Sequence, residues 1–169
     1  ITWTTVSAWR MTVPLTEASN RLDFVGYDLK GNPQTNLTRT VTVYYTGPLP
    51  NLDRAVVFNE IMYNPVTPDT AFVELYNRSG SALDISDWRI NGLGYTFPKG
   101  SIITNGQYLL LVNQAWAYAA AFGTNAGVPF DEFGGNLQNN GETLTLLRPG
   151  TNATEEIVVS KTKYVDVQP

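Results

Sequence analysis

Short segments that carry an apolar side chain at every second position recur along this chain of 169 residues. The first three are WRMTVPL at 9–15, RLDFVGY at 21–27 and RTVTVYY at 39–45. Because successive side chains of a β-strand point to opposite faces, this period of two predicts strands with one apolar and one polar face. Asp, Gly, Asn and Pro lie between the segments and favour turns. The pattern therefore predicts an all-β protein.

The second part of the chain continues this pattern with short strands between turn signals. Strands are predicted at 55–63, 71–77, from 88, and at 95–98, 101–112, 142–148 and 155–161. Strands at this spacing are typical of an antiparallel sandwich or barrel. The Ala-rich segment NQAWAYAAAFG at 113–123 differs from the rest, with Asn113 as a capping residue and Gly123 at its end. It predicts one short surface helix, at 114–122, inserted between strands.

The alternating apolar pattern is interrupted near residue 46. The segment TGPLPNLDR at 46–54 has two prolines, a glycine and no apolar period. Such segments link domains. We therefore expect a partial β-domain at 1–46, a linker at 47–54 and a second domain at 55–169.

Composition excludes several classes of function. Apolar runs such as YLLLV at 108–112 are far shorter than a membrane span, so no membrane insertion is expected. The net charge of -4 and the scattered basic residues argue against a nucleic-acid partner. The chain has no cysteine and no histidine, which removes disulfides, thiolate chemistry and the commonest general base. An enzyme built from it would depend on carboxylates, Lys, Tyr, Ser or Thr.

An ordered series of motifs in the second part resembles the lamin tail domain, a family found at the end of nuclear lamins and in many secreted bacterial proteins. The series is NEIMYNP, FVELYNRSG, LDISDWRI, YTFPKGSIITNGQYLLLV, a short helix ending in FG, and NLQNNGETLTLLRPG. The resemblance implies an immunoglobulin-like antiparallel β-sandwich over nearly all of 55–169, of the bacterial secreted type. Trp88 falls where such a sandwich buries a large aromatic ring between its sheets.

The first part resembles the C-terminal half of a bacterial immunoglobulin-like module. The resemblance lies in WRMTVPLTEASNRLDFVGYDLKGN followed by TVTVYY, and in the positions of Asn20, Asp28, Gly31 and Asn32. Because such a sandwich needs about seven strands, we expect about four more strands upstream.

Strands without their partners leave an apolar face open to water. The candidates for this face are Trp9, Leu22, Phe24, Val41 and Val43. Unpaired strand edges and an open apolar face favour packing on another surface. We therefore expect residues 1–46 to be ordered by contacts with the second domain or by self-association.

Two acids, Glu60 and Glu74, lie on strands that are predicted neighbours. Three uses of the pair are open. In the first, each acid lies on a solvated face and pairs with Arg78, Arg89 or a backbone donor. In the second, the acids bind calcium together with Asn59 and Asp87, because Ca²⁺ takes oxygen ligands. In the third, they form the acid pair of a hydrolase. The turn DLKGN at 28–32 lacks the acids of an EF-hand, and Asp28 side-chain hydrogen bonds are expected to stabilise it.

The predicted helix carries two aromatic residues, Trp116 and Tyr118. Positions two apart do not share a helix face, so both cannot face the core. These two residues are the candidates for a ligand surface, with single surface aromatics that bind nothing as the alternative.

The function favoured by the sequence is a non-catalytic interaction or spacer module of a larger bacterial protein that is extracellular or on the cell surface. The ligand, protein or carbohydrate, is left open, and no cofactor other than calcium is expected. A carbohydrate-binding accessory module of a secreted enzyme is the first alternative, and a carboxylate-dependent hydrolase is the second.

Overall fold

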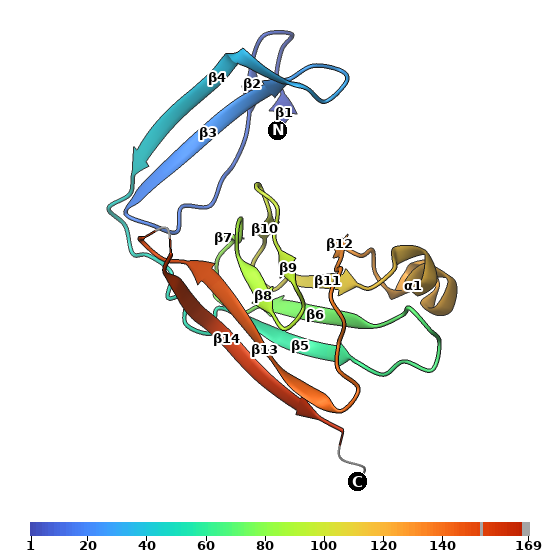
Figure 1. Cartoon of the computed structure of the whole chain (residues 1–169). Helices are drawn as coiled ribbons and strands as arrows, with labels where there is room; N and C mark the ends of the chain where they lie inside the picture. The colour runs from blue at the N-terminus through green and yellow to red at the C-terminus, as the bar shows by residue number, and fades with distance from the viewer. Residues whose placement is uncertain (153, 167–169) are drawn as a thin grey trace. The chain divides into compact units, whose positions relative to one another are not determined.

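The computed structural model describes residues 1–152 and 154–166 and divides the chain into two compact units, 1–50 and 51–169. The division follows Pro50, within the segment predicted as a linker. Figure 1 shows the strands of both units. Each unit is described by itself below.

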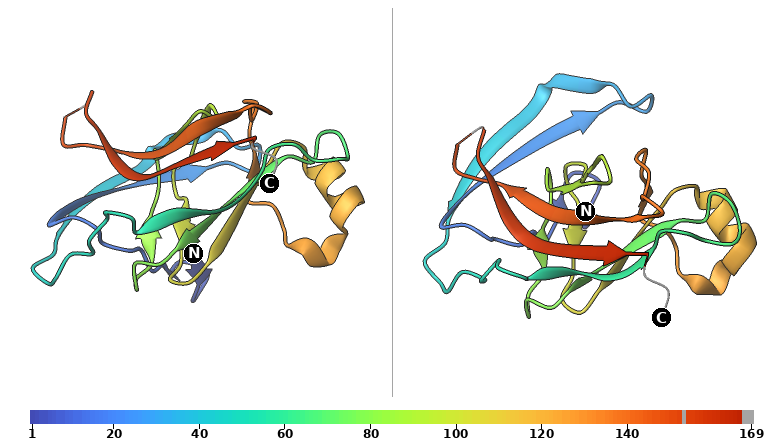
Figure 2. Two further views of the ribbon diagram at one scale, coloured as in Figure 1. Left: turned by 90° about the horizontal axis from the view of Figure 1, so that it is seen from below. Right: turned by 60° about the horizontal axis from the view of Figure 1, so that its bottom comes forward.

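Unit 51–169 is built from two four-stranded sheets, which Figure 2 shows as two layers. One sheet has the order β12 (Asp131–Glu132), β11 (Tyr108–Val112), β6 (Phe72–Asn77) and β5 (Val56–Met62). The other has the order β14 (Glu156–Val165), β13 (Gly141–Pro149), β8 (Arg89–Asn91) and β9 (Tyr95–Thr96). A short pair joins β7 (Leu83–Asp84) and β10 (Ile102–Ile103). The predicted β-sandwich is confirmed. Its one departure from antiparallel order is the parallel pairing of β11 with β12.

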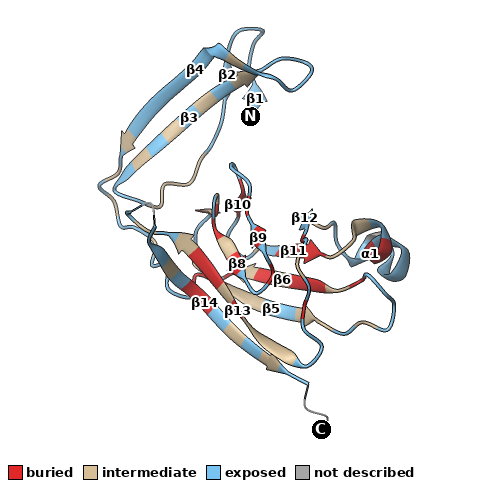
Figure 3. Cartoon of the chain, viewed as in Figure 1, coloured by how far each residue is buried: buried red, intermediate tan, exposed pale blue. Residues whose placement is uncertain are grey.

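The core lies between the two sheets and follows from the period of two. Val73 and Leu75 of β6 are fully buried, as are Leu144 and Leu146 of β13. Trp88 joins the same cluster at 5% exposure, which confirms the predicted burial of this ring. Burying these side chains removes most of their apolar surface from water, and each Å² buried stabilises the fold by about 25 cal/mol. Figure 3 shows the buried positions concentrated on the strands of this unit.

Asn77, the last residue of β6, is the largest polar exception in this core. It is fully buried, and its side-chain amide nitrogen donates to the carbonyl oxygens of Ser81 at 2.8 Å, Ile103 at 3.0 Å and Thr104 at 3.1 Å. Its side-chain oxygen accepts the amide of Ser79 at 2.9 Å. A buried amide is stable only when its hydrogen bonds are made. These bonds join the end of β6 to the following turn and to β10.

We expect Asn77→Ala to lower the free energy of unfolding by about 2–4 kcal/mol, because it leaves buried carbonyl groups without donors and opens a cavity. Urea denaturation measures the change. Asn91→Ala is the matched control, since Asn91 is exposed and makes no side-chain hydrogen bond with any described residue; its effect should stay within about 0.5 kcal/mol. Equal midpoints for the two variants would contradict a structural role for Asn77.

The predicted helix is present as α1 (Ala115–Phe122), followed by the short helix η1 (Thr124–Ala126). Gly123 ends α1 with φ 75°, as expected for a glycine in the left-handed region. The predicted cap Asn113 is wrong. The N-cap position is Gln114, whose side chain makes no capping bond. The Ala115 amide donates instead to the carboxylate of Glu132 from β12 at 2.6 Å.

No helix in the described part of the chain has the length and apolar character of a membrane span.

Unit 1–50 consists of two small antiparallel pairs. One joins β1 (Thr2–Trp3) to β2 (Trp9–Arg10), and the other joins β3 (Ser19–Tyr27) to β4 (Pro33–Tyr44). The strand predicted at 9–15 is wrong beyond Arg10, because residues 11–18 form no strand; Pro14 in this segment has no N–H to donate to a ladder. The strand predicted at 21–27 lies within β3, and the one predicted at 39–45 falls on β4 except for its last residue, Tyr45.

The turn between β3 and β4 is stabilised by Asp28, as predicted. One carboxylate oxygen accepts the amides of Lys30 at 2.8 Å and Asn32 at 2.9 Å, and the other accepts the Asn32 side chain at 3.0 Å. These hydrogen bonds, the Asn32 side chain first, hold the pKa of Asp28 below its usual range. Gly31 takes φ 81° and completes the turn.

The β3–β4 hairpin has one apolar and one polar face. Leu22 lies opposite Val41 and Asn20 opposite Val43 in the register, while Asp23 on the other face accepts the Thr40 hydroxyl. Residues 1–50 are all described, and none of them is buried, as Figure 3 shows for both strands. An isolated two-stranded hairpin is marginally stable in water. This unit therefore has no buried core of its own.

Candidate functional site

The outer face of the β5–β6 pair carries Glu60 and Glu74 directly opposite each other in the register. A bulge between Phe58 and Glu60 leaves Asn59 as an extra residue, so Asn59 and Glu60 are both exposed. The Asn59 amide donates to Glu74 at 2.6 Å. We call Asn59, Glu60 and Glu74 the acid cluster. Like charges directly opposite each other on neighbouring strands are destabilising, and no described cation pairs with either acid.

The cations that the sequence offered as partners for these acids are engaged elsewhere or unpaired. Arg89 forms an ion pair with Glu156, which raises the pKa of Arg89 and lowers that of Glu156 through their hydrogen bonds. Arg78 has no acidic partner among the described residues. The partner of Glu74 is instead the Asn59 amide.

Asp87, the fourth predicted calcium ligand, is held in a different arrangement. Its carboxylate binds the Lys99 ammonium at 2.6 Å, and its backbone has φ 62° in the loop between β7 and β8. Among residues 1–152 and 154–166, no three acids lie within reach of one metal ion. A cation at the acid cluster would therefore have two carboxylates, with the Asn59 carbonyl and water as further oxygen ligands.

The two aromatic residues of α1 have opposite environments. Trp116 is 68% exposed, whereas Tyr118 is 5% exposed and packs edge-on against Phe72 at 5.8 Å. The Tyr118 hydroxyl donates to the Ala126 carbonyl at 2.9 Å. Burial, and then the negative charges of Glu74 and Glu60, raise the pKa of Tyr118. Tyr118 is therefore part of the packing of α1 on the sheet and not of an exposed surface, and the predicted ligand surface is reduced to Trp116.

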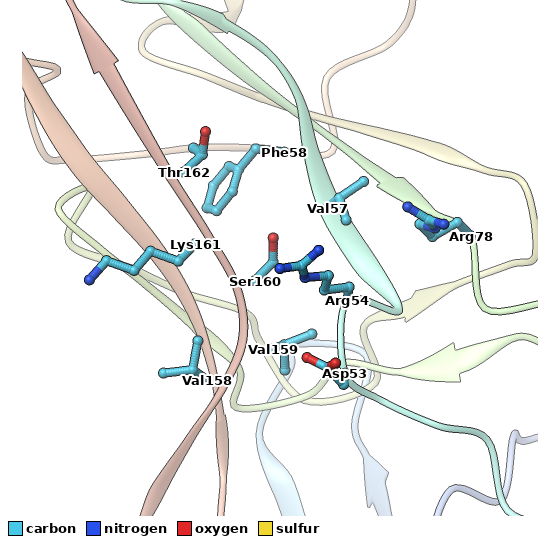
Figure 4. Close-up of a pocket in the computed structure, with 10 residues that line it drawn as sticks. All are labelled: Asp53, Arg54, Val57, Phe58, Arg78, Val158, Val159, Ser160, Lys161 and Thr162. Atoms are coloured by element: carbon cyan, nitrogen blue, oxygen red, sulfur yellow. The ribbon is translucent and has the colours of Figure 1, made fainter.

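A second site, which sequence reasoning missed, lies where the outermost strands of the two sheets meet. A pocket of about 480 Å³ between β5 and β14 is lined by the ten residues labelled in Figure 4, and we call it the edge groove. Its charged side chains are Arg54, Arg78, Lys161 and Asp53. Figure 4 shows Arg54 and Ser160 directed toward one another from the two sides, while Lys161 extends away from Arg54. An adjoining pocket of about 330 Å³ shares Arg54 and Arg78.

Backbone hydrogen bonds fix the two arginines of the edge groove. The Arg54 amide donates to the Val159 carbonyl at 2.8 Å, and the Arg78 amide donates to the Ala55 carbonyl at 2.9 Å. Val159 is the extra residue of a bulge in β14, which turns both Val159 and Ser160 inward. Arg54 has φ 53°, a conformation that is uncommon for a residue with a side chain and is kept only where its surroundings fix it.

The family model of the lamin tail domain matches residues 52–165 of this chain. The chain belongs to the lamin tail domain family. A search of curated proteins gives no match to the chain. The lamin tail domain is immunoglobulin-like, in agreement with the two-sheet architecture of unit 51–169. Both the acid cluster and the edge groove lie within the matched residues.

Part of the edge groove of this lamin tail domain has a signal in the sequence. Arg54 precedes β5 and Arg78 follows β6, and these strands are antiparallel neighbours with Val56 opposite Asn77. The start of one strand and the end of the next therefore bring two arginines to the same end of the sheet. Nothing local indicates that β14 of the other sheet completes the groove with Ser160.

Calcium binding at the acid cluster stays a prediction, with a direct measurement. At a free calcium concentration about a hundredfold above Kd, a bound ion raises the free energy of unfolding by about 2.7 kcal/mol, seen as a higher melting temperature than in chelator. Glu60→Gln should remove the response. Asp87→Asn should keep it, because Asp87 pairs with Lys99 instead. Identical melting curves in calcium and chelator would contradict the site.

Proposed function

We propose that this chain is a non-catalytic interaction and spacer module of a larger extracellular bacterial protein. One observation carries the proposal: the acids best placed for chemistry, Glu60 and Glu74, are exposed and half-exposed on the outer sheet face and line neither of the two pockets described above. An acid pair that hydrolyses a glycosidic bond must flank the bound substrate from two sides. The immunoglobulin-like fold of the family is typically non-enzymatic, which supports the same conclusion.

The placement outside the cell rests on composition. The chain has no cysteine, only 15% charged residues and many Thr and Asn residues, a combination that resembles secreted bacterial surface proteins. The resemblance of its first part to a bacterial immunoglobulin-like module supports an origin in a multidomain surface protein. A spacer role agrees with this organisation, since tandem sandwiches hold other domains at a distance.

A carbohydrate-binding role is the second candidate, favoured by exposed aromatic rings. Trp116 on α1 is 68% exposed, and Tyr108 on β11 is 54% exposed and contacts Tyr76 with ring centroids 4.7 Å apart. Aromatic rings with one open face supply apolar area for ligands that also hydrogen-bond. These rings are the surface that a sugar chain would use.

We expect no turnover above the buffer rate when the chain is mixed with chromogenic glycoside and ester substrates, because it has neither histidine nor cysteine and its acid pair lies outside the two pockets described above. Glu74→Gln should leave this result unchanged. Turnover that Glu74→Gln abolishes would establish the hydrolase alternative.

Electrophoresis in gels containing polysaccharide separates the two remaining roles. Retardation of the chain in such a gel would favour the carbohydrate-binding module if Trp116→Ala relieves it and Ala120→Ser does not.

We also propose that the chain self-associates through unit 1–50. The unit has no buried residue, and Val41 of β4 is exposed on the apolar face that it shares with Leu22. Covering such a face with a second copy would remove apolar area from water.

Light scattering tests self-association. We expect a mass above the 18.7 kDa of one chain that rises with concentration. Val41→Asp should return the mass to that of a monomer, because it places a charge on the apolar face of the hairpin. Thr42→Asp, the neighbouring position on the polar face, should leave the association in place. A wild-type chain that is monomeric at every concentration would contradict this part of the proposal.

A further inference from the structure

The edge groove concentrates positive charge on an acidic chain. Arg54, Arg78 and Lys161 line it together with a single carboxylate, that of Asp53, although the whole chain has a net charge of -4. None of these three cations forms an ion pair with any described residue. A guanidinium is a planar fork of donors that matches a carboxylate in two parallel hydrogen bonds. Two unpaired guanidinium groups in the lining of one pocket are chemically suited to an anionic group.

A second feature of the groove is an unused hydroxyl. Ser160 is 8% exposed and lines the groove, and its hydroxyl makes no hydrogen bond with any described residue. No enclosed side-chain nitrogen or oxygen of the described residues lacks a partner, so this hydroxyl is reached by water from the groove. Figure 4 shows this hydroxyl directed into the groove from the side opposite Arg54. The groove therefore offers a donor and acceptor that the protein itself leaves free.

The groove also runs along two open strand edges. β5 is the outermost strand of one sheet and β14 the outermost strand of the other. Such strands have one side that no neighbouring strand pairs, and extended peptides bind to such edges. On β14 the Val159 carbonyl already accepts the Arg54 amide, so the edge available to a peptide lies beyond this residue. Between the edges, Val57, Phe58 and Val158 supply an apolar wall.

We propose that the edge groove binds an extended acidic peptide segment of a partner protein, whose carboxylates are held by Arg54 and Arg78 and whose main chain lies along the β14 edge. This inference deepens the proposed interaction role and rests on it. Alternating side chains of the bound segment would face the arginines and the apolar wall in turn, because an extended chain has a period of two. Ser160 would hydrogen-bond the main chain or a carboxylate of the segment.

The observations favour a peptide over other anions. Nucleic acid needs many phosphate contacts, and this groove has few cations on a negatively charged chain. Inorganic phosphate would use the guanidinium groups but neither the apolar wall nor the strand edge. An acidic polysaccharide would use the cations but has no amide groups with which to pair a strand.

The experiment uses the full chain and a fluorescent peptide of about ten alternating Glu and Val residues, the length that spans a strand of this size. Fluorescence anisotropy should show binding that weakens as salt is raised. Arg54→Gln and Arg78→Gln should each weaken binding about tenfold, the loss expected for one charge-assisted contact. Arg39→Gln, which removes the same charge from β4, should bind as the wild type does. Melting curves confirm that each variant is folded.

Further measurements test the guanidinium contacts and the carboxylates of the peptide. Arg78→Lys retains the charge but not the fork, so intermediate affinity is expected. The peptide should shift the backbone amide resonance of Ser160, and a peptide with Gln in place of Glu should bind about tenfold more weakly or not at all. Binding that is insensitive to both arginine variants would overturn the inference, as would stronger binding of oligogalacturonate or inorganic phosphate than of the peptide. Absence of peptide binding would also overturn it, yet would leave the lack of hydrolytic turnover, and so the non-catalytic role, intact.

Discussion

The buried amide of Asn77 organises the end of the sandwich on which the proposed binding site depends. Its hydrogen bonds to Ser79, Ser81, Ile103 and Thr104 join β6, the turn after it and β10 into one corner. Arg78 is the next residue after this anchor, so its backbone position is set by the same network. A polar group in an apolar core is stable only in an arrangement that makes all of its hydrogen bonds. The Asn77 network therefore gives this corner a defined geometry.

Bulges in the two outermost strands give the sandwich two chemically different surfaces. In β5 the bulge at Asn59 exposes two successive polar side chains and places an amide beside Glu74. In β14 the bulge at Val159 buries two successive side chains, turns Ser160 toward the groove and aims a carbonyl at the Arg54 amide. One extra residue in a strand thus produces an acidic face in one sheet and part of a basic groove in the other.

These surfaces suit recognition better than catalysis. The acids of the acid cluster lie on the sheet face beside α1, and the basic groove has cations, a hydroxyl and an apolar wall but neither histidine nor thiol. Unit 1–50 adds a hairpin with one apolar face and no buried residue. The proposed interaction role therefore rests on an acidic face and a basic groove in the lamin tail domain and on an apolar hairpin face in unit 1–50, each of which would act through complementarity of charge or apolar surface.

The sequence alone determined the local features of this protein, because each depends on neighbours along the chain. The period of two specified most strands, the Ala-rich run ending at Gly123 specified α1, and Asp28 specified its own turn. The burial of Trp88 was expected from the resemblance to the lamin tail domain. Only the tertiary structure decided which groups meet across the layers. Glu132, not Asn113, binds the first amide of α1, and Ser160 meets Arg54 from a strand more than a hundred positions later. Such pairs depend on strand order and register, which are set by the packing of the whole sandwich and leave no local pattern.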